Sequence, residues 1–407
     1  MEVNKKILNK NLTGKQAGYH RAVKIWLIVG LIMVVGQIVI GGITRLTESG
    51  LSITEWKPLS GAMPPLNAAD WQDEYEKYAA SPQFEKIFAD ISMADFKFIY
   101  FWEWFHRQWA RIMGMVFIVG FLAFWRKGWL HGRLMRRLGI TVLLAAIAAS
   151  FGWIMVASGL HDRPWVNAYK LTIHLSLGIT LFSYLLWTTL KVLYPLEQGY
   201  PQNGVEKWLK PLNIVLVLQL ILGGIMSGAR TAIVYPEWPL MKGEFLPSVI
   251  TDINMWTVEN FVNYEQSVFQ PALIQFLHRT SAYLLIIIVI GYLIQAFSKA
   301  ISPLLVKTNA MLVTLLVIQA LLGIATAVSS LGQVPVGLGV AHQFGAIALV
   351  GVVVLLNYLY HPGRVLADVD KTVEKLDKIV ATVELVPLGM KIRANPTHKI
   401  ICTQIVG

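Results

Sequence analysis

Four histidines stand at related places in a chain that is otherwise mostly apolar: His106, His174, His278 and His342. Each lies early in an apolar stretch of roughly 20 residues, the length that crosses a bilayer as a helix. A polar ring in lipid is costly unless it faces the protein interior, so each histidine is a functional candidate. Because an imidazole nitrogen is a good metal ligand, the chemistry to expect is metal ligation.

The histidines fall into two sets, each with one residue early in a second span and one early in a fourth span. Two imidazoles on facing helices at matched depth can bind opposite sides of one iron, which is how a helical bundle holds haem without cysteine. The single cysteine, Cys402, excludes an internal disulfide and a cysteine-based cluster. We therefore predict two haem sites, although hydrogen bonding of each ring to a neighbouring helix is the structural alternative. Five further histidines are given no ligand role: His20, His131, His161, His361 and His398.

A carboxylate accompanies the first histidine only. Glu103 lies three residues before His106, on the same helical face, whereas Gln275 holds the matching place before His278. A carboxylate can accept a proton or stabilise developing positive charge, which an amide cannot do. We therefore expect a reaction chamber in the first half of the chain and a permanent electron-transfer haem in the second.

An arginine follows the first histidine of each set. Arg107 and Arg279 are placed to bind a haem propionate bidentately. Extension of these side chains to lipid headgroups is one alternative, and a simple ion pair of Glu103 with Arg107 or Arg111 is another. Arg111 is the weaker candidate because Tyr283 occupies its matching place.

The elements that carry these residues are membrane spans. The 407 residues are 55% hydrophobic and 14% charged, with a mean hydropathy of +0.54, which is typical of a polytopic membrane protein. We expect an all-α integral membrane protein with eight transmembrane helices, beginning near Ala22, Phe98, Gly139, Leu171, Pro211, Ala272, Leu304 and Leu338. The net charge of +11 does not indicate nucleic acid binding, because the basic residues form short runs between apolar segments.

The distribution of charge predicts the orientation. Basic residues crowd the N-terminal segment and the second-to-third connection, whereas the connections at 46–95 and 232–270 are poor in Lys and Arg. Both termini are therefore expected in the cytoplasm. Because the N-terminal segment has no signal-peptide pattern, we expect a multi-pass protein of the bacterial inner (plasma) membrane.

An internal repeat divides the chain. QIVIGGITRLTESGLSITEWKPLSGAMPP at 37–65 aligns without a gap with QLILGGIMSGARTAIVYPEWPLMKGEFLP at 219–247, a shift of 219 − 37 = 182 residues. This repeat predicts two tandem four-helix bundles related by a pseudo-twofold axis along the membrane normal. The expected segments are a cytoplasmic N-terminal segment at 1–21, the first half at 22–193, a cytoplasmic linker at 194–208, the second half at 209–362 and a cytoplasmic tail at 363–407. The paired glycines of each repeat would let helices or a flat ligand approach closely, and the Trp-rich outer connections are either interfacial or a lid.

Five segments carry a family resemblance: GGITRLTESGLSITEWKPLSGAMPP, EWFHR, KLTIHLSLG around His174, QFLHRTSAYLL around His278 and VAHQFGA around His342. Together they extend over roughly Ala22 to Pro362. In this combination the chain resembles the haem A synthase family, in the branch shared by proteobacteria and mitochondria.

The resemblance implies an oxidoreductase that oxidises the C8 methyl of haem O to a formyl group, through hydroxylated intermediates with water-derived oxygen, to give haem A for cytochrome oxidase. It implies haem b at His278 and His342 and substrate haem O at His106 and His174. Glu103 falls at the family's essential carboxylate, which would assist loss of electrons and a proton from the methyl or stabilise the resulting cation.

The implied partners are a haem O synthase (farnesyl transferase), cytochrome oxidase assembly factors, membrane lipid and an unidentified electron acceptor, with no nucleic acid. The sequence leaves open that acceptor, homo-oligomer formation and simultaneous occupancy of both haem sites. Some family members carry an outer-loop cysteine pair; its absence here excludes a thiol-linked redox step. The tail at 363–407 has no recognised counterpart, and its stretch 368–385 fits either an amphipathic helix or a disordered extension.

Two other interpretations are weighed against this one. A dihaem b-type cytochrome that only transfers electrons is disfavoured because all four histidines are predicted on one side of the bilayer. A haem carrier is disfavoured because it has little use for a carboxylate at Glu103.

Overall fold

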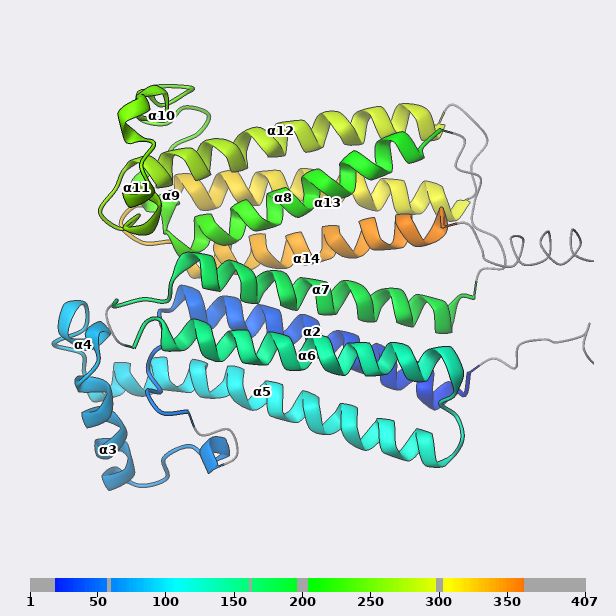
Figure 1. Ribbon diagram of the computed structural model, residues 1–407, viewed down its shortest axis with the longest axis horizontal. Helices are drawn as coiled ribbons and strands as arrows, with labels where there is room; N and C mark the ends of the chain where they lie inside the picture. The colour runs from blue at the N-terminus through cyan, green and yellow to red at the C-terminus, as the bar shows by residue number, and fades with distance from the viewer. Residues whose placement is uncertain (1–18, 57–59, 161–162, 196–203, 298–302, 362–407) are drawn as a thin grey trace, which may run out of the picture. The chain divides into compact units, whose positions relative to one another are not determined.

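The computed structural model describes residues 19–56, 60–160, 163–195, 204–297 and 303–361. Within these residues, eight helices are long and apolar enough to cross a membrane (Figure 1). They are α2 (Arg21–Leu46), α5 (Met93–Arg126), α6 (Gly132–Ala157), α7 (Ala168–Leu193), α8 (Glu206–Gly228), α12 (Phe269–Phe297), α13 (Pro303–Val328) and α14 (Val336–Leu359). The described part contains no β-strand, so the predicted all-α class and the eight predicted spans are confirmed.

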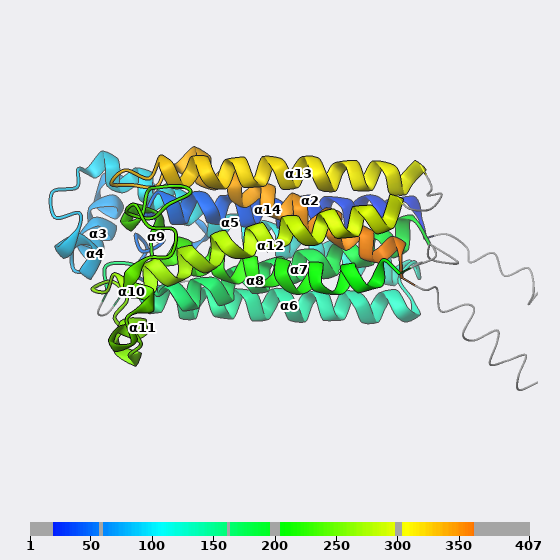
Figure 2. The same cartoon turned by 90° about the horizontal axis from the view of Figure 1, so that it is seen from above.

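Short helices fold the two long connections at one end of the spans, as both views show (Figures 1 and 2). They are η1 (Ser60–Ala62), α3 (Ala68–Ala79) and α4 (Pro82–Lys86) before α5, and α9 (Thr231–Val234), α10 (Ser248–Thr251), η2 (Ile253–Met255) and α11 (Val258–Val262) before α12. Each connection has its own small core, around Tyr78 and Phe96 in the first and around Tyr235 and Phe269 in the second. The sequence predicted the connections but not these helices.

Helix α5 begins at Met93 rather than near Phe98. The Ser92 side chain caps its first turn, and Phe96 packs against Tyr78 of α3 with ring centroids 5.2 Å apart. The apolar pattern missed this extension because a cap and loop contacts hold it, not burial in lipid.

The long helices pack as two similar sets of four. In the first set α2 packs on α5 and α6 on α7; in the second, α8 packs on α12 and α13 on α14. The sets meet where α7 contacts α8 and where α2 contacts α14. In Figure 1 the second set lies above the first. The repetition of these pairings is consistent with two tandem four-helix bundles.

The two sets touch through residues that are equivalent in the repeat. Glu48 and Arg230 are separated by 230 − 48 = 182 residues, both have a left-handed backbone with φ of 58° and 54°, and their side chains form an ion pair at 2.6 Å. Arg45 Nη2 donates at 2.6 Å to the main-chain oxygen of Ser227, which is also 182 residues away. Contact between equivalent residues is expected close to a twofold axis.

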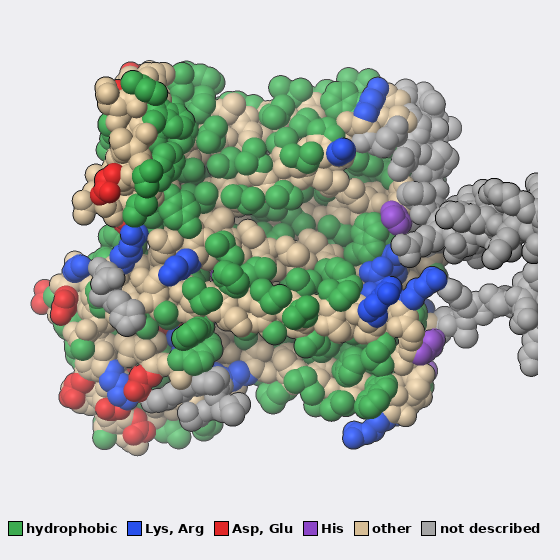
Figure 3. Space-filling model, in the orientation of Figure 1, with side chains coloured by type: hydrophobic (Ala, Val, Ile, Leu, Met, Phe, Trp, Pro, Cys, Tyr) green, Lys and Arg blue, Asp and Glu red, His purple; other side chains and the backbone are tan. Residues whose placement is uncertain are grey.

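The two ends of the helices differ in charge. On the face shown in Figure 3, Asp and Glu gather, together with some Lys and Arg, at the end that carries the short helices, whereas the opposite end shows Lys and Arg without Asp or Glu among the described residues. The basic residues at the end of α5, at the start of α6 and between the two helices lie at this opposite end: Arg126, Lys127, Arg133, Arg136 and Arg137. This asymmetry follows the positive-inside pattern.

The domain boundaries inferred from the sequence stay predictions. The segment 1–18, the tail 362–407 with its stretch 368–385, and residues 196–203 of the predicted linker lie outside the described residues.

Candidate functional site

Each of the four histidines lies in a notch formed by a glycine on a neighbouring helix. His106 of α5 faces Gly41 of α2, where an alanine Cβ would lie 2.9 Å from the imidazole Cε1. A carbon contact that short would force the ring or the helix to move. Glycine is therefore the residue that leaves space for this imidazole.

The same contact recurs at the other three histidines. The corresponding distances from an alanine Cβ to Cε1 are 2.9 Å for Gly152 and His174, 3.1 Å for Gly223 and His278, and 2.8 Å for Gly323 and His342. The close approach expected at Gly41 and Gly223 is thus present. Gly152 and Gly323 were missed because they lie outside the aligned repeat segment.

A polar group beside each notch reaches the imidazole. Three of these groups are glutamine amides, whose Nε2 atoms lie 3.3 Å (Gln37 to His106), 3.2 Å (Gln219 to His278) and 3.1 Å (Gln319 to His342) from a ring nitrogen. The fourth is the main-chain oxygen of Ala148, 3.0 Å from His174 Nδ1, which therefore donates. The sequence singled out Gln37 and Gln219 only as repeat markers and missed Gln319.

His106 and His174 lie near one another, as do His278 and His342. Ligation of an iron by either pair stays a prediction. Hydrogen bonding to a neighbouring helix, the structural alternative, is present, and the two roles are compatible because an imidazole has two nitrogens.

A haem fits the residues present. His278 Nδ1 is buried without a hydrogen-bond partner, as a nitrogen available to a metal would be. Among the described residues no group of three or more His, Cys, Asp or Glu is placed to hold a metal ion. A haem needs only two axial ligands from the protein, and each pair of imidazoles can supply them.

Glu103 is buried, with 3% of its surface exposed, and all its bonds go to neighbouring protein groups. Its Oε2 accepts from Ser52 Oγ and from the Ile53 N–H, both at 2.8 Å, and its Oε1 accepts from Arg107 Nη2 at 2.5 Å. The ion pair considered as an alternative is therefore present. The predicted catalytic role of Glu103 stays a prediction.

In the second half, Gln275 donates a hydrogen bond to the loop, whereas Glu103 accepts one from it. Its Nε2 donates to the main-chain oxygen of Tyr235 at 2.6 Å, and Tyr235 is the repeat equivalent of Ile53 because 235 − 53 = 182. Gln275 Oε1 is buried without a partner. The same loop position thus donates to a carboxylate in one half and accepts from an amide in the other.

The two arginines hold the long connections that precede α5 and α12 onto these histidine-bearing helices. Arg107 donates to the main-chain oxygens of Ile53 and Glu55 at 3.2 and 3.4 Å, and Arg279 donates to those of Pro239 and Phe245. Arg279 is only 8% exposed, so extension to lipid headgroups does not describe it. Propionate binding by either arginine stays a prediction.

The start of α7, which positions His174, is fixed by the long connection that precedes α12. Asn167 caps the helix, and the Ala168 N–H donates to the Tyr264 phenol oxygen at 2.8 Å. Burial raises the pKa of Tyr264 to about 12, so this phenol stays protonated and uncharged at neutral pH. A group from the second half thereby supports a histidine of the first.

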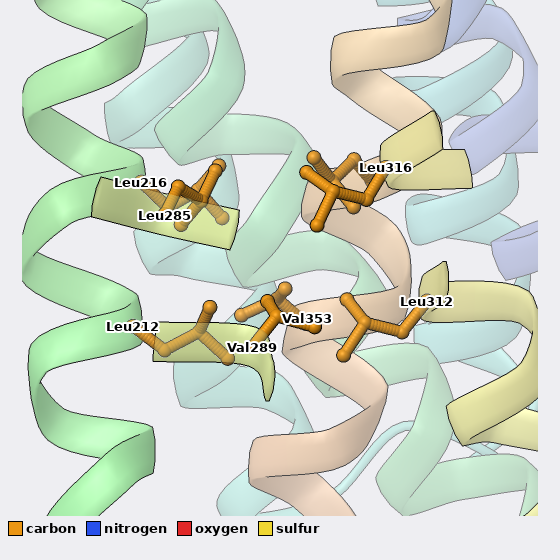
Figure 4. A pocket seen from close by; sticks show the side chains of 8 residues that line it. Leu212, Leu216, Leu285, Val289, Leu312, Leu316 and Val353 are labelled. Atoms are coloured by element: carbon orange, nitrogen blue, oxygen red, sulfur yellow. The ribbon is translucent and has the colours of Figure 1, made fainter. Parts of the chain in front are cut away.

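Leucine and valine fill the second half beneath its histidines (Figure 4). The residues are Leu212, Leu216, Leu285, Val289, Leu312, Leu316, Leu349 and Val353, and the gap between them is too narrow for water. All of them lie 7 or 11 residues from a histidine or a notch glycine, as in 285 − 278 = 7 and 289 − 278 = 11. They therefore form two layers, two and three helical turns below the imidazoles.

In the first half, the positions 7 and 11 residues before the notch glycines carry smaller side chains on α2 and α6. Counted from Gly41, these positions are Val34 and Gly30 on α2, since 41 − 34 = 7 and 41 − 30 = 11. Counted from Gly152, they are Ala145 and Thr141 on α6. The second half has leucine at all four matching positions, whereas α5 and α7 carry residues of similar or larger size there: Met113, Phe117, Leu181 and Leu185.

The two histidine-bearing helices α5 and α12 also differ in how far buried residues continue along them. The last buried residue of α5 is Glu103, before His106, whereas burial along α12 continues from His278 as far as Ala296. Below its histidine, α5 is therefore more exposed than α12.

The histidines without a predicted ligand role lie apart from these pairs where they are described. His20 caps α2 through its Nδ1 and stacks on Trp129 with ring centroids 3.7 Å apart, and His131 precedes α6. His161 and His398 lie outside the described residues.

Eight apolar helices with two repeat-related pairs of imidazoles define a multi-pass helical membrane protein built around two similar sites. Residues 24–354 match the family model described as cytochrome oxidase assembly protein. The chain belongs to this family.

Several similar bacterial proteins bear the name heme A synthase. The protein of Maricaulis maris is 39% identical over 336 residues, which cover 81% of this chain and 93% of the relative. That of Sinorhizobium medicae is 36% identical over 338 residues (83% and 89%), and that of Brucella abortus is 34% identical over 330 residues (81% and 89%).

Proposed function

We propose that the protein is a haem A synthase, an oxidoreductase that converts haem O to haem A for cytochrome oxidase. Membership of the cytochrome oxidase assembly family and the relatives named heme A synthase support this function. The structural observation that carries it is the presence of two similar imidazole pairs, only one of which has a carboxylate three residues away.

The first half is the proposed site of the substrate, haem O, between His106 and His174. Haem O carries a long isoprenoid tail, which needs apolar space beside the ring. The smaller side chains at Gly30, Thr141 and Ala145, together with the sparse burial along α5, favour this half over the second.

The second half is the proposed site of a resident haem b between His278 and His342. Its interior is closed by leucine and valine two and three helical turns below the imidazoles, which suits a haem without a long tail. When bound there, haem b would supply one-electron transfer. Arg279, beside His278, is the proposed propionate contact, as Arg107 is in the first half.

Glu103 is the proposed proton acceptor. Oxidation of a methyl to a formyl group releases four electrons and four protons and takes one oxygen atom from water, so the reaction needs a base and an electron acceptor. Glu103 accepts three hydrogen bonds in the structure, one of them from Arg107. Release of Arg107 from Oε1 would free a carboxylate oxygen for a proton while Ser52 and Ile53 keep the side chain in place.

The proposed location is the bacterial inner membrane, with both termini in the cytoplasm. The basic connection between α5 and α6 supports a cytoplasmic position for that end of the helices. An even number of spans then returns the chain to the same side. A haem O synthase in the same membrane would supply the apolar substrate.

The test is to co-express the full chain with a haem O synthase in a bacterial host that makes no haem A. Extracted haems are separated by chromatography and identified by mass. We expect haem A together with its alcohol intermediate. Unchanged haem O beside folded protein loaded with haem b, in a membrane that also contains a cytochrome oxidase, would contradict the proposal.

A further inference from the structure

The groups that reach the four imidazoles share one spacing. Each lies four residues before the notch glycine on the same helix: 41 − 37, 152 − 148, 223 − 219 and 323 − 319 all equal 4. Four residues are about one helical turn, so the group stands directly beside the notch. Three of the four are glutamines, and the fourth, at Ala148, is a main-chain oxygen.

Two of the glutamines offer an acceptor that no other group uses. The Nε2 atoms of Gln37 and Gln319 donate to the main-chain oxygens of His106 and His342, at 3.3 and 2.9 Å. The Oε1 atom of each is buried without a hydrogen-bond partner. The amide is thus anchored through its nitrogen beside the ring while its oxygen stays available.

Gln219 is anchored differently. Its Oε1 accepts from Ser281 Oγ, and its Nε2 lies 3.2 Å from His278 Nε2. A carbonyl oxygen has two lone pairs, so this Oε1 can accept a second hydrogen bond when the ring turns.

An acceptor of this kind is what an iron-bound histidine requires. A ligating imidazole gives one nitrogen to the metal and donates the N–H of the other, which fixes the tautomer and makes the ring a stronger electron donor. The Ala148 oxygen already accepts the Nδ1–H of His174. At His106, His278 and His342 the amide atom nearest the ring is a glutamine Nε2, so the amide or the ring must turn before Oε1 accepts the N–H.

We propose that Gln37, Gln219 and Gln319 are positioning residues that accept the free N–H of iron-ligating His106, His278 and His342, and that the Ala148 main-chain oxygen does so for His174. This rests on the proposed function in that each imidazole pair holds a haem. It follows that both ligands of the second-half haem are supported by side chains, whereas one ligand of the first half is supported by the backbone alone.

The test is the midpoint potential of haem b bound to the purified full-length protein, measured at about pH 8, where a glutamate beside an imidazole N–H is ionised. In Q319E a stronger acceptor makes the imidazole a better donor, so the potential shifts downward. In Q319L the acceptor is lost, so the potential shifts upward. Shifts of opposite sign are the expected result, because a purely structural role would not reverse the sign.

Gln343 provides the matched control. It is adjacent to His342 and donates to the Ile38 main-chain oxygen at 2.8 Å without being placed on an imidazole. Q343L should leave the potential unchanged. If Q319E and Q319L shift the potential in the same direction, or by no more than Q343L, the inference is wrong.

A second pair of variants keeps the test decisive if the Gln319 variants do not retain haem b. Q219E and Q219L act on the other ligand, His278, and should give the same opposite shifts. Wild-type protein that folds but binds no haem b would contradict the proposed function. Haem b that binds with a potential insensitive to all four variants would contradict this inference alone.

Discussion

The two halves of the molecule hold the long connections before α5 and α12 by the same means, but the hydrogen bond at one position runs in opposite directions. In both, an arginine that follows the histidine donates to loop carbonyl oxygens, and a residue three places before the histidine bonds the equivalent loop position. In the first half that residue is Glu103, which accepts; in the second it is Gln275, which donates. The loop and the helix keep the same arrangement, while the side chain that joins them is a carboxylate in one half and an amide in the other.

A second difference lies below the imidazoles, where the positions of four leucines on α8 and α13 carry smaller residues on α2 and α6, while α5 and α7 carry residues of similar or larger size than those on α12 and α14. Similar helix arrangements with a carboxylate in one half and an amide in the other, and with smaller side chains on two helices of the first half, favour a division of labour. We infer a half that transforms its haem and a half that keeps it.

The largest expected effect comes from removing the second pair of imidazoles. H278A or H342A should abolish haem b binding, because one axial ligand is lost, whereas H106A or H174A should leave it. The haem b content of each purified protein, relative to H131A as a control, measures this. Equal loss of haem b in all four variants would contradict the proposal that only the second half binds haem b.

Filling a notch should have the next largest effect. An alanine at Gly323 would place Cβ 2.8 Å from His342, so G323A should lower haem b occupancy and destabilise the fold by about 1–3 kcal/mol. G152A, at His174, should spare haem b and impair haem O conversion. The measurements are haem content and thermal unfolding in detergent.

Gly114 and Gly139 serve as controls for these variants because a Cβ at either position meets nothing within 4 Å. G114A and G139A should keep both haem b and haem A formation, since alanine is the better helix former. A loss in these controls as large as in G323A would show that the notch is not the cause.

Filling the first-half interior should have a moderate effect. A145L introduces the residue found at the matching position, Leu316, and should lower the kcat/KM for haem O roughly tenfold by displacing the tail of the substrate. Haem b content should not change. If A145L converts haem O as the wild type does, the substrate tail does not occupy this layer.

The smallest expected effect is at the contact between the halves. Glu48 and Arg230 are each about a quarter exposed, at 26% and 23%, so their ion pair is partly screened and should contribute roughly 1 kcal/mol or less. A double-mutant cycle with E48A and R230A in thermal unfolding gives this coupling. Complete dissociation of the two halves in E48A would contradict so modest a contribution.

Much of the fold could be predicted from the sequence. The eight spans follow from hydropathy, and the repeat is visible because Gln, Gly-Gly and Glu-Trp recur in one register. The early start of α5 could not be predicted in this way, because a Ser92 cap and aromatic packing determine it rather than lipid. The short helices of the two long connections could not be predicted from hydropathy for the same reason.

The four histidines of the candidate site could be selected from the sequence, but the glycines and amides around them could not. The four histidines stand out because they are polar residues at matching depths. Gly152, Gly323 and Gln319 carry no such signal, since glycine and glutamine occur in apolar helices for many reasons. Their role becomes visible only when the neighbouring helix places an imidazole against them.

The reciprocal exchange of Glu103 and Gln275 tests the division of labour most directly. Haems are extracted from membranes that contain a haem O synthase with either E103Q or Q275E, and haem A, haem O and haem b are quantified. We expect E103Q to reduce haem A at least about a hundredfold while haem b stays bound, and Q275E to remain within a few-fold of wild type. Normal haem A formation by E103Q, or its loss in Q275E alone, would contradict the assignment of the reaction to the first half.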